Sequence, residues 1–228
     1  VRHAQNGNIH YFHIDTTTAG KANAQNIVNK WCIDNGTPLL MSLDANNYPE
    51  PDAIAELYFS ATDTNNLSVI SATSIADTKR KSRIFQTAKD KVQGKGRSHS
   101  NEINGWLLAW GPQNIETLGG IPQVACEDYA TGVLIRAANQ QILHSNRAHI
   151  HGYEPTSLTD RIRQYARSYR GRLQMLASYP DQKVQDIVLN DHHFMRKFPD
   201  RFAELTRWVK ENPKAAPFSL TKWLMWEV

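Results

Sequence analysis

Four carboxylates stand at the ends of short apolar runs, where they could hold a metal ion and activate a water. They are Asp15, Asp44, Glu127 and Asp128. Carboxylates that converge on Mg²⁺ or Mn²⁺ position a phosphate and lower the pKa of a bound water. We therefore predict a divalent-metal site in which Asp15, Asp44 and Glu127 are catalytic residues and metal ligands, with Asp128 and His149 as further ligands. For Asp15 alone, which precedes three threonines, a helix N-cap is the simpler interpretation.

A strand–helix–strand pattern surrounds the first two of these acids. Residues 9–15 and 38–44 have strand composition, and residues 19–34 have apolar side chains at near-helical spacing. Such a βαβ unit predicts parallel strands, which would place Asp15 and Asp44 at one carboxyl edge of a sheet. Further apolar or amphipathic segments follow at 53–61, 67–71, 75–92, 106–110, 124–126, 128–140 and 141–145.

The last third of the chain is patterned differently, because every segment beyond Pro155 has helical spacing. We therefore predict two parts. Residues 1–153 form an α/β domain with a mainly parallel sheet and flanking helices. Residues 154–228 form an all-helical, basic region.

Charge is segregated along the chain, although the net charge is only +4. The first 70 residues are mainly acidic, residues 77–97 are strongly basic, and residues 136–172 are basic through arginine. Basic flanks beside an acidic pocket are typical of polyanion binding, so we predict a nucleic-acid partner, DNA or RNA; two solvated helix faces are the alternative. Arginine grips phosphates and tyrosine stacks on bases. The predicted nucleic-acid-binding residues are Lys79, Arg80, Arg83, Arg97, Arg161, Arg163, Arg167, Arg170, Tyr165 and Tyr169.

The order of these motifs over residues 9–150 resembles the PIN-like 5′-nuclease superfamily, which includes the flap endonucleases. The matching segments are His13-Ile14-Asp15, Ser42-Leu43-Asp44, the basic region 79–97, and Gly120-Ile121-Pro122 leading to Glu127-Asp128-Tyr129-Ala130. The resemblance implies metal-dependent phosphodiester hydrolysis with Mg²⁺ or Mn²⁺. The chain departs from the family where Tyr129 replaces an acid and where Arg147-Ala148-His149 replaces the final acidic pair. These departures indicate a degenerate acidic site.

Two alternatives to a metal-dependent hydrolytic nuclease of this superfamily stay open at this point. The first is a non-catalytic DNA- or RNA-binding component of a replication or ribonucleoprotein complex. The second rests on His149-Ile150-His151 followed by Tyr165 and Tyr169, which resembles the HUH-type tyrosine endonucleases. Alternate residues of a strand share a face, so the two histidines could share a metal while a helix tyrosine attacks phosphate.

Composition indicates the cellular compartment of the protein and argues against a membrane location. Hydrophobic residues make up 40% of the chain, and no run approaches the roughly 18 apolar residues of a membrane span. The first residues are polar and lack the apolar core of a signal peptide. Two cysteines do not make a disulfide framework, which favours a reducing compartment. We therefore predict a cytoplasmic protein without a membrane partner.

Overall fold

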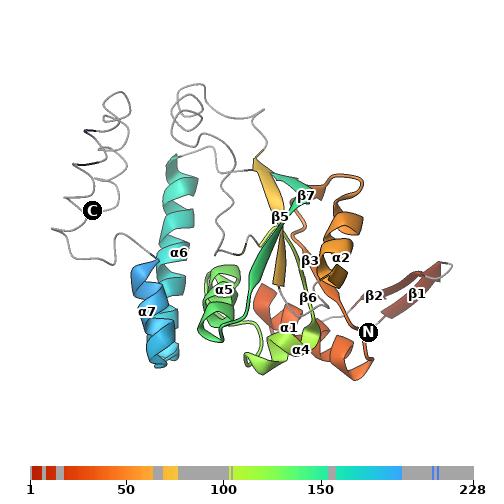
Figure 1. The fold of residues 1–228 in the computed structure, drawn as a ribbon, viewed down its shortest axis with the longest axis horizontal. Coiled ribbons are helices and arrows are strands. Elements are labelled where there is room, and N and C mark those ends of the chain that lie inside the picture. The colour runs from red at the N-terminus through yellow and green to blue at the C-terminus, as the bar shows by residue number, and fades with distance from the viewer. Residues whose placement is uncertain are drawn as a thin grey trace.

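The computed structural model describes residues 2–6, 9–13, 18–63, 69–76, 103, 105–153, 158–191, 207 and 210. Over these residues the chain is a mixed α/β protein with a five-stranded sheet of order β3-β6-β5-β7-β4 and a separate hairpin, β1-β2 (Figure 1). The strands are β1 (Arg2–Asn6), β2 (Ile9–His13), β3 (Leu40–Leu43), β4 (Tyr48–Pro49), β5 (Val69–Ala76), β6 (Leu107–Trp110) and β7 (Ile142–Gly152). The helices are α1 (Lys21–Asp34), α2 (Ala53–Asp63), α4 (Pro112–Thr117), α5 (Glu127–Ala137), α6 (Leu158–Ser178) and α7 (Gln182–Asn190).

The prediction of a mainly parallel sheet is wrong. Three pairs of the five-stranded sheet are antiparallel, namely β3 with β6, β6 with β5, and β4 with β7. Among the described strands the one parallel pair is β5 with β7. Residues 9–13 pair with residues 2–6 in the hairpin and not with β3, so the expected βαβ unit does not form. A continuous apolar run is typical of strands in parallel sheets, but what it indicates directly is burial on both faces, and antiparallel strands covered by helices on both faces have the same pattern.

Strand β6 shows why an antiparallel sheet can have a continuous apolar pattern. Leu107 and Ala109 pack in the cluster that includes α2, whereas Leu108 and Trp110 pack on the other face in the cluster that includes α1 and α4. Helices therefore cover both faces of the sheet, and all four residues of β6 are buried. Burial of one large apolar side chain contributes about 1.5–3 kcal/mol, so both faces stabilise the fold.

A third apolar cluster joins α5 to α6 and α7 through residues such as Val133, Met175 and Val188. Arg136 of α5 also donates to both carboxylate oxygens of Asp191, which follows α7. Residues 158–178 and 182–190 are helical as predicted, and beyond residue 191 the structure describes only residues 207 and 210. A domain boundary at residue 153 stays a prediction. None of the described helices is both long enough and apolar enough to cross a membrane.

Two asparagines fasten α1 to its neighbours and so place its first residue, Lys21. Asn29 is 1% exposed; it accepts from Trp110 Nε1 at 3.1 Å and donates to the first carbonyl of α4 at 3.1 Å. Asn26 donates to the Ile121 carbonyl at 2.9 Å and accepts from the Ile121 N–H at 2.7 Å. Buried amides that satisfy both partners fix the orientation of a helix.

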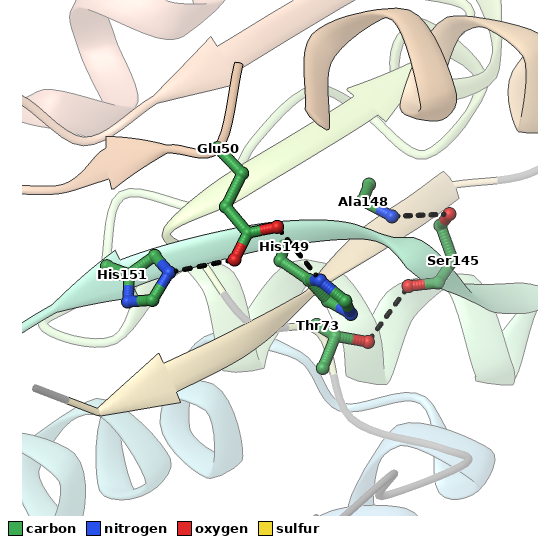
Figure 2. A network of polar contacts seen from close by, with 6 residues as sticks. All are labelled: Glu50, Thr73, Ser145, Ala148, His149 and His151. Atoms are coloured by element: carbon green, nitrogen blue, oxygen red, sulfur yellow. Dashed lines mark hydrogen bonds and ion pairs between the residues drawn. The ribbon is translucent and has the colours of Figure 1, made fainter. Parts of the chain in front are cut away.

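A bulge divides the parallel pair β5-β7. Ala72 lies opposite Ser145 and Thr73 lies opposite His149, so residues 146–148 have no partner in β5. Ser145 stabilises the bulge, because its hydroxyl accepts from the Ala148 N–H at 3.2 Å and its carbonyl accepts from the Thr73 hydroxyl at 2.9 Å (Figure 2). A bulge bends a strand and re-aims the side chains beyond it. Here those side chains are His149 and His151.

Candidate functional site

Three element ends meet at Lys21. Its ammonium nitrogen donates to Asp44 Oδ1 at 2.6 Å and to Glu127 Oε1 at 2.8 Å. Asp44 directly follows β3 and Glu127 opens α5, so acids 83 positions apart in the sequence share one cation. The Asp44 N–H donates to the carbonyl of Trp106 at 3.0 Å, which holds the end of β3 against the segment before β6.

The surroundings of Lys21 define a position for positive charge. Burial by itself lowers the pKa of Lys21, but the hydrogen bonds that its ammonium donates to Asp44 and Glu127, together with the charges of these two acids, outweigh burial and raise that pKa above 10.5. The Asp44 and Glu127 side chains are only 26% and 16% exposed, so water screens them weakly. Because Asp44 Oδ1 and Glu127 Oε1 both contact the Lys21 nitrogen, these two oxygens lie close to each other on either side of it. This separation places both carboxylates around one cation.

Asp128 lies beside this pair and has different electrostatics. Burial, followed by the charge of Glu127, raises the pKa of Asp128 above its ordinary value of 3.8. The Tyr129 N–H donates to Asp128 Oδ1 at 2.8 Å and opposes that shift. Gly105 leaves the room that Asp128 occupies, because a Cβ at Gly105 would lie 2.7 Å from Asp128 Oδ2. A carboxyl group with a raised pKa suits proton transfer better than it suits metal binding.

A small pocket opens next to the three acids. Lys21, Glu127 and Asp128 line it together with two polar side chains, Gln25 and Thr131. Gln25 donates to Ser42 at 2.9 Å, whereas its buried Oε1 makes no hydrogen bond among the described residues. The remaining walls are apolar and come from Val69, Ile103, Leu108, Trp110, Ile115 and Ile121. An apolar pocket with a few polar groups at its rim is the common form of a ligand site.

His149 lies in a second polar cluster and not with the acids. His149 Nδ1 donates to Glu50 Oε2 at 3.1 Å, and His151 Nε2 donates to Glu50 Oε1 at 3.0 Å (Figure 2). The hydrogen bonds from His151 and then from His149 lower the pKa of Glu50 below 4.5, so Glu50 is ionised near neutral pH. An ionised carboxylate only accepts hydrogen bonds, so both ring nitrogens that face it carry protons. We call this arrangement the Glu50 clasp.

The predicted metal set is therefore divided. The structure brings Asp44 and Glu127 together with Asp128 adjoining them, it places His149 in the Glu50 clasp, and Asp15 lies outside the described residues. Over the described ranges, no three histidine, cysteine, aspartate or glutamate side chains are arranged to hold a metal by themselves. A metal bound by Asp44 and Glu127 would need further ligands beyond these two side chains.

The predicted nucleic-acid-binding residues are described only in part. Lys79, Arg80, Arg83 and Arg97 lie outside them. Arg161 lies on α6, and further along that helix Arg163, Arg167, Arg170, Tyr165 and Tyr169 are exposed. Arg163 donates to Asp160 at 3.3 Å within the same helix. Arg163, Arg167 and Arg170 are therefore solvated side chains of α6.

Sequence reasoning missed Lys21, Gln25 and Glu50. Lys21 and Lys30 are the only lysines in the acidic first 70 residues, which is a signal that one of them neutralises the acids. Glu50 has no comparable signal, because only the bulge in β7 and the pairing of β7 with β4 bring the two histidines to it.

No known protein family matches the sequence, and no curated protein matches it. Among solved structures, the fold is similar to the mannosyltransferase PcManGT from Pyrobaculum calidifontis, which was solved in complex with GDP-Man and Mn²⁺. The TM-score is 0.53 and the identity is 17% over 92% of this chain and 61% of that chain. At this identity the likeness establishes a shared fold, and this chain spans less than two thirds of the mannosyltransferase.

This likeness corrects the family and function predicted from the sequence. The resemblance to PIN-like nucleases is wrong, as are the nuclease activity, both alternatives and the nucleic-acid partner, because the shared fold is that of an enzyme that binds a nucleotide sugar. The physical reason is that carboxylates at strand ends suit any metal-bound phosphate, whether in a phosphodiester or a sugar-linked diphosphate. The prediction of a divalent metal is compatible with the Mn²⁺ of that structure.

Proposed function

We propose that this chain is the donor-binding part of a glycosyltransferase that takes a nucleotide sugar with a divalent metal ion. The observation that carries the proposal is the meeting of Asp44 and Glu127 at one cation position beside a pocket. The similar fold of a mannosyltransferase that binds GDP-Man and Mn²⁺ supports it. The cytoplasmic location predicted from the sequence is a separate expectation that this proposal does not need.

The residues present fit Mg²⁺ or Mn²⁺ bound through a substrate. Both ions prefer oxygen ligands, and Mg²⁺ in nucleotide sites is usually held by one or two carboxylates plus substrate phosphates. Asp44 and Glu127 supply two such carboxylates. A metal bound there would neutralise the diphosphate of a nucleotide sugar. Lys21 would then turn from the two acids to the departing diphosphate.

Asp128 is the proposed general base. In glycosyl transfer, a hydroxyl oxygen of the acceptor forms a bond to the anomeric carbon of the donor sugar. The bond from that carbon to the diphosphate oxygen breaks, and the nucleoside diphosphate leaves with the electron pair. The hydroxyl proton passes to the Asp128 carboxylate, whose raised pKa favours taking a proton.

The pocket supplies recognition for the donor. Gln25 Oε1 is a buried acceptor that makes no hydrogen bond among the described residues, so a hydroxyl or N–H of a nucleotide would satisfy it. The Thr131 hydroxyl donates to the Glu127 carbonyl at 2.7 Å and fixes the first turn of α5. The acids and the pocket are therefore parts of one site.

The test measures binding and turnover of nucleotide sugars, GDP-mannose first, with Mn²⁺ and with EDTA. We expect Mn²⁺-dependent binding that Asp44→Asn and Glu127→Gln weaken, and activity that falls about 10²–10³-fold in each variant. Asp128→Asn should keep binding and lose about 10²–10⁴-fold in transfer. Glu116→Gln, an exposed acid on α4, is the matched control. Donor binding that ignores Mn²⁺ and both substitutions would overturn the proposal.

A further inference from the structure

A second group of side chains gathers on one face of the β4-β7 pair. Tyr48 lies opposite His151 in the strand register, and residues two apart on a strand share a face. The same face therefore carries Tyr48 and Glu50 from one segment, and His149, His151 and Tyr153 from the other. We call these five residues the aromatic platform. The opposite face of β7 is covered, because Ala148 and Ile150 pack with α2 in the apolar core.

The rings of the platform are held in a defined arrangement. Tyr48 stacks on His151 with ring centroids 6.3 Å apart and an interplanar angle of 9°. Tyr153 meets Tyr48 edge-on, with centroids 5.8 Å apart and an angle of 71°. Tyr48 and Tyr153 are nevertheless 43% and 46% exposed, so large parts of both rings face solvent. A sugar ring binds such a surface by laying its C–H face on an aromatic ring while its hydroxyls reach polar neighbours.

The Glu50 clasp supplies those polar neighbours. An ionised carboxylate has about four lone-pair positions, and His149 and His151 use one on each oxygen. Glu50 is 35% exposed, so its remaining lone pairs are accessible to hydroxyl donors. Figure 2 shows the carboxylate held between the two imidazoles, which fixes its orientation before any ligand arrives. Preorganised polar groups bind a ligand at a smaller entropic cost.

A short turn links the platform to the acidic site. The turn that starts at Asp44 leads directly into β4, and the Asn47 N–H donates to the Asp44 carbonyl at 3.0 Å. A Cβ at Gly152 would lie 2.4 Å from Asn47 Oδ1 and 2.8 Å from the Trp106 ring, so β7 approaches the Asp44 turn and the segment before β6 closely. Asn47 is 8% exposed, and its buried Nδ2 has no hydrogen-bond partner in the described part of the chain.

We propose that the aromatic platform is the subsite for the acceptor carbohydrate, with Tyr48 and Tyr153 stacking on its ring and Glu50 accepting from its hydroxyls. This inference rests on the proposed glycosyl transfer, because it gives the second sugar a place on the strand that follows the Asp44 turn. A neutral, hydroxyl-rich ligand matches this surface, because tyrosine rings surround one carboxylate that already accepts a hydrogen bond from each histidine.

The first test measures direct binding of methyl α-D-mannopyranoside and methyl α-D-glucopyranoside, with ligand-observed NMR as the readout. We expect Tyr153→Ala and Tyr48→Ala to weaken binding at least tenfold and Tyr153→Phe to keep most of it, since the ring remains. Tyr58→Ala on α2 removes a tyrosine of similar exposure, 49%, and should leave binding unchanged. Absence of glycoside binding to the wild-type protein, or equal binding by the Tyr48 and Tyr153 variants, would overturn the subsite.

A second measurement separates this inference from the proposed function. Hydrolysis of GDP-mannose to the nucleoside diphosphate without an acceptor uses only the donor site. Tyr48→Ala and Tyr153→Ala should retain Mn²⁺-dependent hydrolysis while the KM for the glycoside acceptor rises. Loss of hydrolysis together with transfer would refute an acceptor role for the tyrosines. If no nucleotide sugar reacts with the wild-type protein, the proposed function fails, and the glycoside titration still decides whether the platform binds sugar.

Discussion

Lys21→Met removes the cation between Asp44 and Glu127 while keeping a side chain of similar length. We expect the variant to be less stable than the wild-type protein at neutral pH, because two weakly exposed carboxylates then face one another without a positive charge. We also expect Mn²⁺ to stabilise the variant more than it stabilises the wild-type protein. Both results follow if the Lys21 ammonium occupies the position of the metal.

The size of the loss follows from the two contacts. A hydrogen bond to a charged group contributes about 1.5–3 kcal/mol, so two of them suggest roughly 3 kcal/mol or more. The Lys21 side chain is 40% exposed, and solvent screening therefore reduces this to about 2 kcal/mol. For a chain of 228 residues, 2 kcal/mol corresponds to a fall in Tm of about 4–8 °C.

Thermal unfolding of the two proteins with EDTA and with Mn²⁺ makes the comparison. Lys30→Met is the matched control on the same helix, because Lys30 lies 3.8 Å from Asp34 and both side chains are more than half exposed. Such a surface pair contributes about 0–0.5 kcal/mol, so this variant should melt with the wild-type protein. An unchanged Tm in Lys21→Met, or a Mn²⁺ effect equal in both proteins, would refute the reasoning about the cation position.

Three further substitutions test the electrostatics and packing around the site. Asp128→Asn should raise the free energy of unfolding at neutral pH but not below pH 3.8. The reason is that the pKa of Asp128 is raised in the folded state, so the ionised carboxylate destabilises the folded protein as the pH rises above 3.8. Thermal melts at several pH values measure this difference. Asn29→Ala should cost about 2–4 kcal/mol in urea unfolding, since it leaves Trp110 Nε1 and a helix carbonyl buried without partners. Asp191→Ala should cost about 2–4 kcal/mol by removing the carboxylate that pairs with the largely buried guanidinium of Arg136, and Asp191→Asn should recover part of that loss.

Local chemistry in the sequence determined the identity of many elements. The apolar run before Asp44 became β3, the amphipathic segment after Gly20 became α1, and the arginine-rich segment became α6. Backbone propensity and the spacing of apolar side chains act over a few residues, so they can be read from the chain. The sequence also predicted that Asp44 and Glu127 are site residues. An acid that follows a strand, or that begins the helix after a strand, lies at the edge of the sheet where sites form.

Only the tertiary structure decided how these elements pair and which side chains meet. The antiparallel placement of β6 next to β3, the cation between Asp44 and Glu127, and the clasp of Glu50 by His149 and His151 all join residues far apart in the chain. Such contacts depend on strand direction, on one bulge and on the packing of α1. No local pattern determines these features, because strands that are buried on both faces have similar apolar sequences in parallel and in antiparallel sheets. The same carboxylates therefore suggested a nuclease from the sequence, whereas the structure brings two of them to one cation, which is the basis of the proposed function.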